Sequence, residues 1–392
     1  MGRYASNQFA VNASSAALGS THKLNVAVVS TQNEWHGGEE QAALLIDGLN
    51  RRGHTCHVMA RETSEFANRM QARGVPVMTF RGRGQLPTTM WQMRRRLQLI
   101  RPDVIFYNDP HALTYAGMAA WGLSIPLRVA SRRVDFPLKV VRRYRRMSDV
   151  VVCVSHAVRQ VCVDCGLQAA DLEVVHDGVD PQRMQGGDRR RGRESLGVAD
   201  DTTVLLTVAK LTDHKGHRFM MEAMPNIVRD FPRLQWAIAG DGPLHGQLEK
   251  QAAALGVTKH VRFLGYRHDV PDLLAAADLM IVPSHMEGLC SSIVDAMLVE
   301  VPIVATRAGG IPDLLDRRGI HQPPVGWLVP PRDAEALAKG VRDALRFPHV
   351  TARQVAQAEE RARREFTAEQ MVEQTLHIFR ERLARRFVAA AA

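Results

Sequence analysis

Short apolar runs alternate with segments of helical periodicity along most of the chain. KLNVAVVS (23–30) is a valine-rich run that predicts a buried strand, whereas QAALLIDGLNRRG (41–53) has apolar residues at helical spacing and ends at a glycine. Further strand-like runs are found at 54–61, 76–80, 103–108, 128–132 and 149–155, and helical segments at 64–74 and 156–166. Strands that alternate with helices predict a parallel sheet with helices on both faces.

The pattern weakens at DGVDPQRMQGGDRRRGRESLG (177–197), where Gly, Asp, Pro and a run of charges collect, and we interpret this segment as a linker. A second series begins with a strand in TTVLLTVAKL (202–211) and a helix in HRFMMEAMPNIVRDF (217–231), and it continues to helical segments at 333–346 and 366–386. The sequence therefore predicts an α/β protein with two doubly wound, Rossmann-like parallel-sheet domains. We expect ligands at the carboxyl ends of the strands, in a central cleft that both domains face.

A chain of 392 residues is too long for one ordinary core, which also favours two domains. We expect a disordered tail (1–22), an N-terminal domain (23–183), a C-terminal domain (184–365) and a last helix (366–392). No stretch approaches the roughly 18 apolar residues of a membrane span, and the first 22 residues lack the basic start and apolar core of a secretion signal.

The five cysteines are widely scattered: Cys56, Cys153, Cys162, Cys165 and Cys290. Their odd number and spacing argue against a disulfide framework and for a reducing, cytoplasmic environment. Cys162 and Cys165 form a CxxC without a second ligand pair at a fitting spacing, so we expect them to pack and not to bind zinc.

The net charge of +10 is concentrated in the first half, since residues 1–200 contain 27 Lys and Arg against 18 Asp and Glu, whereas the whole chain contains 51 against 41. Such a field attracts anionic lipid, nucleic acid or anionic substrates. Trp91, Leu97 and Ile100 beside Arg94–Arg96 predict a basic amphipathic helix, which either docks on anionic lipid or is a solvated basic face. Nucleic-acid binding is disfavoured because these arginines lack interleaved aromatic residues on strands, and no recognition-helix motif is present.

Two loops after predicted strands have residues suited to anion binding. In HGGEE (36–40), Gly37 and Gly38 allow backbone N–H groups to approach an anion at the start of a helix, although an ordinary turn has the same composition. In AKLTDHKGH (209–217), Lys210 and Lys215 can hold a diphosphate, and the alternative is a pair of solvated loop lysines.

A third loop, SHMEGLCSSIVDAM (284–297), leads from a predicted strand into a helix. Ser291, Ser292 and the backbone N–H groups at the helix start can bind phosphate oxygens. Glu287 before the helix and Asp295 one turn into it can accept hydrogen bonds from sugar or ribose hydroxyls. The alternative is that Glu287 caps the helix and Asp295 is solvated.

Five motifs occur in order: AKLTDHKGH, AGDGPLHGQLE, FLGYRHDVPDLLAAADLMIVPSHMEGLCSSIVDAM, VPIVATRAGGIPDLL and GWLVPPRDAEALA. This series resembles family 4 of the retaining glycosyltransferases (glycosyl transferases group 1), which have the GT-B fold. The likeness extends over nearly all of residues 23–386 and is densest from 204 to 340. The resemblance implies transfer of a sugar from a nucleotide-sugar donor with retention of the anomeric configuration. It also implies that the N-terminal domain (23–183) is the acceptor side, that the C-terminal domain (184–365) binds the nucleotide sugar, and that the last helix (366–392) crosses back to the first domain.

The resemblance also implies roles for individual residues. Glu287 matches the first acid of the family's E-x7-E motif, near the donor sugar, and Asp295 matches the second, which holds the ribose. Lys215 matches the lysine at the donor diphosphate. Backbone near the sugar or phosphates is expected at Gly288, Leu289, Cys290 and Ser291, and Gly37 and Gly38 match the glycine loop that closes over the phosphates. The expected catalytic residues are Lys210, Lys215 and Glu287.

The chain departs from the family pattern at three places. Lys210 stands where the family has arginine, which removes the bidentate fork. Asp295 is one methylene shorter than glutamate. Asn108 stands where many relatives have a histidine, and Asp109 or His111 can substitute for it, although His111 can equally cap the next helix. With Arg132, Arg133 and Asp135, which follow a strand, these three residues are the acceptor-side candidates.

The expected reaction is substitution on one face of the anomeric carbon, with the lysines and backbone N–H groups offsetting charge on the leaving diphosphate. No cofactor or metal is expected, because no DxD motif follows a strand and the lysines can take a metal's place. We expect a glycan or lipid-linked acceptor, such as a precursor of a cell-envelope polysaccharide or glycolipid, and a peripheral position on the inner membrane face. The alternatives are a GT-B sugar-nucleotide epimerase, an inactive homologue or, more remotely, a basic nucleic-acid-binding protein.

Overall fold

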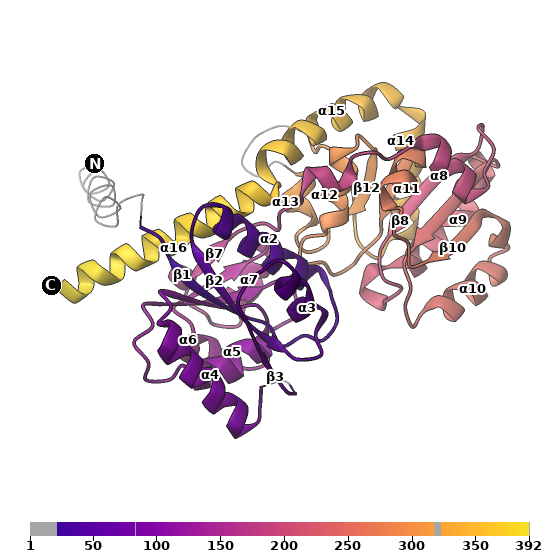
Figure 1. The fold of residues 1–392 in the computed structure, drawn as a ribbon. Coiled ribbons are helices and arrows are strands. Elements are labelled where there is room, and N and C mark those ends of the chain that lie inside the picture. The colour runs from indigo at the N-terminus through magenta and orange to yellow at the C-terminus, as the bar shows by residue number, and fades with distance from the viewer. Residues whose placement is uncertain (1–21, 83, 317–322, 392) are drawn as a thin grey trace, which may run out of the picture. The chain divides into compact units, whose positions relative to one another are not determined.

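The computed structural model describes residues 22–82, 84–316 and 323–391. Contacts within the chain divide it into two compact units: the first unit is Met1–Gly178 with Ala368–Ala392, and the second unit is Val179–Thr367 (Figure 1). Apart from His22, the expected N-terminal tail lies outside the described residues. None of the helices in the described ranges is both long enough and apolar enough to cross a membrane.

The first unit is built on a seven-stranded parallel sheet with the order β3-β2-β1-β4-β5-β6-β7. Its strands are β1 Asn25–Val29, β2 Thr55–Arg61, β3 Val77–Phe80, β4 Val104–Tyr107, β5 Leu127–Arg132, β6 Val150–Cys153 and β7 Leu172–Val174. Its helices are α2 Gly37–Arg51, α3 Glu65–Ala72, α4 Pro87–Ile100, α5 Pro110–Ala119, α6 Val141–Met147, α7 His156–Asp164, the short 3-10 turn η1 Ala169–Asp171 and α16 Ala368–Ala391. The strand order runs outward from β1 in both directions, as a doubly wound sheet requires.

The strand β1 is buried on both faces, which explains its continuous apolar run. Val26, Val28 and Val29 have no exposed surface. The last helix, α16, packs against α2 (Figure 1). At their contact a Cβ on Gly48 would lie 2.4 Å from Cγ2 of Val372, so only glycine allows this close approach.

The second unit is built on a six-stranded parallel sheet with the order β10-β9-β8-β11-β12-β13. Its strands are β8 Thr203–Val208, β9 Leu234–Ala239, β10 Val261–Gly265, β11 Leu279–Val282, β12 Ile303–Thr306 and β13 Trp327–Val329. Its α-helices are α8 Arg189–Leu196, α9 His217–Asp230, α10 His245–Ala254, α11 Val270–Ala276, α12 Ser291–Leu298, α13 Ile311–Leu315, α14 Ala334–Arg346 and α15 Pro348–Glu365. Its 3-10 turns are η2 Pro181–Met184, η3 Asp213–Lys215 and η4 Thr258–His260. The predicted fold class, two doubly wound parallel-sheet domains, is confirmed.

The core of the second unit contains one polar contact that fixes a large aromatic side chain. Trp236 is fully buried on β9, and its indole N–H donates to Oγ1 of Thr207 on β8 at 3.0 Å. Because an unpaired buried N–H is costly, this bond between β9 and β8 lets the core keep a tryptophan.

The prediction that residues 177–197 form a linker is wrong for the second half of this segment, because the helix α8 forms there. Asp188 caps α8 by accepting from the N–H of Arg191 at 2.7 Å, and Gly197 ends it in the left-handed conformation. The arginines of the charge run form ion pairs with carboxylates of the same unit: Arg191 pairs with Asp272, and Arg189 pairs with Asp278. Residues 179–183, which we expected in the first domain, also pack with the second unit, so the division lies at Gly178.

Candidate functional site

The predicted catalytic residues Lys215 and Glu287 meet at the carboxyl edge of the second sheet. The ammonium of Lys215 lies 2.6 Å from Oε2 of Glu287, and the Ser284 hydroxyl lies 3.3 Å from the same oxygen. The Lys215 side chain is 19% exposed and the Glu287 side chain 11%. The alternative of a solvated Lys215 is therefore wrong.

Two glycines hold the strand-end loops against one another. Gly216, with φ +71°, precedes α9, and a Cβ there would lie 2.0 Å from the Pro283 carbonyl oxygen. Gly309, with φ +49°, follows β12, and a Cβ there would lie 1.8 Å from the Glu287 carbonyl oxygen. The Gly310 N–H donates to that same carbonyl at 3.0 Å. Because β8, β11 and β12 are neighbours in the sheet, the loops that follow them pack closely against one another beside the ion pair.

Burial keeps two titratable groups beside this ion pair neutral. His217 at the start of α9 is 1% exposed, and burial together with the nearby Lys215 charge lowers its pKa to about 4. Burial raises the pKa of the Cys290 thiol to about 11, so no thiolate competes with an incoming anion there. Neither His217 nor Cys290 therefore adds a charge beside the pair at neutral pH.

The start of α12 lies directly after Glu287 in the chain. Cys290 is the N-cap with φ +81°, and its sulfur lies 3.3 Å from the Ser292 hydroxyl. Leu289 is 3% exposed and is part of the core, whereas Gly288 and Ser291 are half-buried. Lys210 lies in the loop after β8 and is exposed. The helix start thus presents backbone N–H groups and a hydroxyl near the ion pair, an arrangement suited to an anion.

The alternative of a solvated Asp295 is wrong, because its carboxylate is buried and paired with an arginine. The guanidinium of Arg183 grips its carboxylate with two hydrogen bonds, from Nε to Oδ1 at 3.0 Å and from Nη2 to Oδ2. Arg183 belongs to η2, which packs against α12. Our sequence interpretation missed Arg183 because it lies in the segment assigned as a linker.

In the first unit, Asn108 lies at the centre of a hydrogen-bond network beside the glycine loop. Its Nδ2 donates to the Gly38 carbonyl and to Oε1 of Glu39, both at 3.2 Å, and its Oδ1 accepts from Nη1 of Arg133 at 2.9 Å. Asn108 and Glu39 are buried, and burial raises the pKa of the Glu39 carboxyl. The network fixes the backbone at Gly38, while Gly37 has no neighbour where a Cβ would stand.

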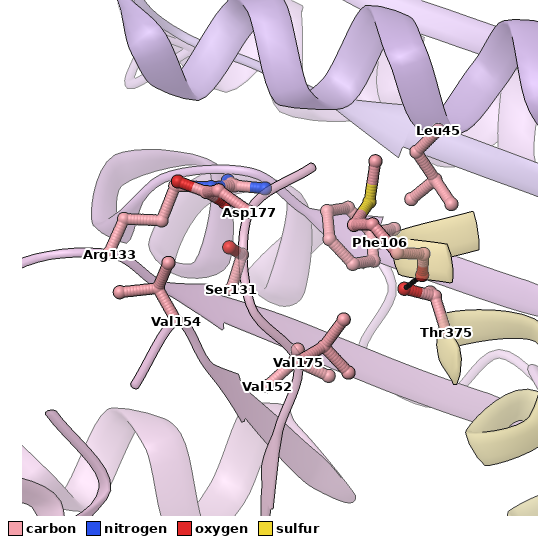
Figure 2. Close-up of a pocket in the computed structure, with 10 residues that line it drawn as sticks. Leu45, Phe106, Ser131, Arg133, Val152, Val154, Val175, Asp177 and Thr375 are labelled. Atoms are coloured by element: carbon pink, nitrogen blue, oxygen red, sulfur yellow. Dashed lines mark hydrogen bonds and ion pairs between the residues drawn. The ribbon is translucent and has the colours of Figure 1, made fainter. Parts of the chain in front are cut away.

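The same network continues to a small pocket with one polar end, shown in Figure 2. Arg133 and Asp177 form an ion pair at 3.1 Å at this end, and Ser131 lies beside them, whereas Phe106 and Leu45 lie toward the other end. The pocket has a volume of about 10 Å³, room for no more than about one water. It is therefore too small to hold a sugar ring.

The remaining acceptor-side candidates have clear structural contacts. Asp109, and not His111, caps α5 by accepting from two backbone N–H groups, and it also accepts from the hydroxyl of Thr31 at 2.7 Å. Arg132 is buried and donates to the Phe136 carbonyl, and Asp135 is half-buried in the following loop. These contacts explain why the residue types occur at this edge, and their acceptor-side roles stay predictions.

Two family models match the chain. The model described as Glycosyltransferase Family 4 matches residues 35–183, and the model described as Glycosyl transferases group 1 matches residues 188–364. The first match lies almost entirely in the first unit, and the second lies wholly in the second unit.

Curated relatives and solved structures agree with these matches. The chain is 34% identical over 200 residues to D-inositol 3-phosphate glycosyltransferase of Geodermatophilus obscurus, covering 48% of this chain and 43% of the relative. It is 30% identical over 249 residues to the GDP-mannose-dependent alpha-(1-6)-phosphatidylinositol monomannoside mannosyltransferase of Mycolicibacterium smegmatis, covering 60% and 61%. The matches thus span about half the length of these relatives. The crystal structure of Anabaena Alr3699/HepE in complex with UDP shares the fold, with a TM-score of 0.79, 23% identity and coverage of 91% and 99%.

Proposed function

Because this chain belongs to the GT4-type glycosyltransferases of GT-B fold, we propose that it moves a glycosyl group from a nucleoside-diphosphate sugar to a hydroxyl acceptor, with retention of configuration. The observation that carries this proposal is the Lys215–Glu287 pair at the start of α12. A cation for the diphosphate and a carboxylate for sugar hydroxyls stand within one hydrogen bond of each other. The UDP and UDP-glucose complexes of Anabaena Alr3699/HepE support a donor of this class.

In the proposed reaction the bond between the anomeric carbon and the diphosphate oxygen breaks, and the acceptor oxygen bonds to the same face of that carbon. The leaving diphosphate gains negative charge, which the ammonium groups of Lys215 and Lys210 and the N–H groups at the start of α12 offset. The departing phosphate oxygen takes the proton of the acceptor hydroxyl. No separate protein base is needed in this scheme.

We further propose that the reaction uses no metal, since the two lysines supply the positive charge that a divalent cation would otherwise bring. Glycosyl transfer in the presence of excess EDTA tests this proposal. Undiminished turnover supports it, and loss of turnover that is restored by added Mg²⁺ or Mn²⁺ contradicts it.

The proposed acceptor is lipid-linked, or a precursor of a cell-envelope polysaccharide or glycolipid, met at the inner face of the cytoplasmic membrane. The first unit supports this proposal with a surface that is both apolar and basic. On α4 Trp91 is 59% and Leu99 76% exposed, and Arg95 stacks over the Trp91 ring at 5.0 Å. Leu97, which we expected on this face, is buried in the core instead. Trp121 after α5 is also exposed, and Arg94 donates to its carbonyl. Such a face suits an interface with anionic lipid.

Sedimentation with vesicles tests the membrane part alone. We expect binding to vesicles containing phosphatidylglycerol at low salt, weaker binding at high salt, and a clear loss in Trp91→Ala with Trp121→Ala. Exposed Tyr266 on the second unit gives the matched aromatic control, Tyr266→Ala. Equal sedimentation of the wild type and the double variant would contradict the membrane proposal and leave the donor chemistry untouched.

Two experiments test the transfer itself. A thermal-shift screen with UDP, GDP and ADP should identify the nucleotide by a rise in melting temperature, because a ligand of the native state stabilises it. Incubation with the matching sugar nucleotide then separates the activities: an epimerase alters the sugar without an acceptor, whereas a glycosyltransferase needs one. If none of the three nucleotides shifts the melting temperature, the proposed function is wrong.

A further inference from the structure

The ion pair between Arg183 and Asp295 places a cation where a bare carboxylate was expected. The pair occupies Nε and Nη2 of Arg183, the two nitrogens on one edge of the guanidinium plane. Nη1 carries two more N–H groups that take no part in the pair. Asp295 therefore fixes the plane of the guanidinium without using all of its donors.

The two side chains differ in exposure, which decides which one a ligand meets. The Asp295 side chain is 6% exposed, whereas the Arg183 side chain is 32% exposed. The backbone that holds Arg183 is also fixed, because Asp180 caps η2 by accepting from the Gln182 N–H at 2.9 Å. A molecule approaching this point of the second unit meets a positioned guanidinium before it meets the carboxylate.

This guanidinium lies beside the helix start that we assign to the donor. Asp295 is four residues after Ser291 and three after Ser292 on α12, so the three side chains share one face of the helix. One helical turn corresponds to about 5.4 Å, roughly the distance from a phosphate to the adjoining ribose hydroxyls. With phosphates at the helix start, the ribose therefore reaches the position of Arg183.

We propose that Arg183 is a donor-binding residue that donates hydrogen bonds to the ribose hydroxyl oxygens, and that Asp295 is the positioning residue that orients it. The inference rests on the proposed function, since it requires a nucleotide donor. The inference also explains why an aspartate can stand where the family has a glutamate. The shorter side chain of Asp295 holds Arg183, and Arg183 spans the remaining distance to the ligand.

The test compares ribose recognition in variants of Arg183. Titration calorimetry gives the Kd of UDP, 2′-deoxy-UDP and 3′-deoxy-UDP, with the GDP or ADP series used instead if the thermal-shift screen selects that base. In the wild type we expect at least one deoxy nucleotide to bind about tenfold more weakly than its ribose parent, the usual effect of losing a hydrogen bond to a charged group. The ratio of these two Kd values, deoxy nucleotide over ribose parent, is the ribose ratio. In Arg183→Met the ribose ratio should fall to near one.

The opposite arrangement, in which the Asp295 carboxylate itself binds the ribose, predicts a different result. Removal of Arg183 would then release the carboxylate, and the ratio would stay at its wild-type value or rise. A wild-type ratio near one for both deoxy nucleotides would also overturn the inference. If the wild type binds no nucleoside diphosphate at all, the proposed function is refuted first, and this inference falls with it.

Arg183→Met leaves a buried carboxylate without its partner, so it can fail to fold. Arg183→Lys avoids this problem, because the ammonium still neutralises Asp295 but lacks the planar fork that reaches past it. We expect the ribose ratio of Arg183→Lys to fall by at least threefold, whereas a ratio equal to that of the wild type contradicts the proposal. Arg190, 88% exposed on α8, gives the matched controls Arg190→Met and Arg190→Lys, which should keep the wild-type ratio.

Discussion

Replacement of Lys215 by methionine should separate a catalytic from a structural role of the Lys215–Glu287 pair. Methionine keeps most of the apolar stem of lysine and removes only the charge. At 2.6 Å and an effective dielectric constant of about 20, the attraction between the two charges is about 6 kcal/mol before desolvation is subtracted. Breaking a buried pair costs about 3–5 kcal/mol and breaking a surface pair under about 1 kcal/mol.

The exposures of 19% and 11% place this pair between those limits. We therefore expect Lys215→Met to lower the free energy of unfolding by about 2 kcal/mol, which is about 4–8 °C in melting temperature for a unit of this size. The effect on the chemistry should be larger. A positioned donor that stabilises charge only in the transition state contributes about 100- to 1000-fold to kcat.

The assay is the initial rate of nucleotide release at saturating donor, measured well below the melting temperature and divided by the concentration of folded enzyme. Lys250→Met, on the exposed side of α10, is the matched control and should leave both quantities unchanged. A variant of Lys215 with a lowered melting temperature but a kcat within threefold of wild type would show that the pair only supports the fold.

Three further predictions concern stability. His217→Leu should make the protein more resistant to acid. The pKa of His217 in the folded state, about 4, lies below its usual value, so the wild type loses stability as pH falls from about 6.5 to 4. Thermal unfolding measured across this pH range should show a smaller loss of stability for the variant. Gly309→Ala should lower the free energy of unfolding by more than about 2 kcal/mol in denaturant titration, whereas the control Gly37→Ala, with open space at its Cβ position, should fold normally. Asn108→Asp should place a second carboxylate beside Glu39, whose pKa is already raised, so the variant's melting temperature should fall more steeply than that of the wild type as pH rises from 5 to 8.

The fold was predictable from the sequence because its strands are short apolar runs that end in polar loops. The helix α8 was not identified from the pattern, and its contacts explain why. The helix α8 reads RRRGRESL, which has little apolar content, and it is held by the cap at Asp188 and by carboxylates at Asp272 and Asp278. These partners lie more than 80 residues away, so local periodicity carries no trace of them.

The candidate site was predictable in part for the same reason. Strand-end loops of neighbouring parallel strands meet at one edge, so β8 and β11 had to bring Lys215 toward Glu287. The partner of Asp295 was not predictable, because η2 is irregular and its contact with α12 depends on packing within the second unit. Sequence patterns assign residues to helices, strands and loops. Only the packed structure shows which of two paired side chains is exposed to a ligand.

Both carboxylates that the sequence marked as donor ligands are paired with a cation, and this pairing bears on how a nucleotide sugar would bind. Glu287 with Lys215 and Asp295 with Arg183 are each close to neutral as units. Neutral hydroxyls of a sugar or ribose can add hydrogen bonds to such a pair without leaving a buried charge uncompensated, which would cost several kcal/mol. A diphosphate, in contrast, needs positive charge beyond these neutral pairs, and in the proposed reaction Lys210 and the start of α12 add it beside the ammonium of Lys215. The arrangement therefore favours a ligand whose charge sits at its centre and whose hydroxyls lie on either side, as in a nucleoside-diphosphate sugar.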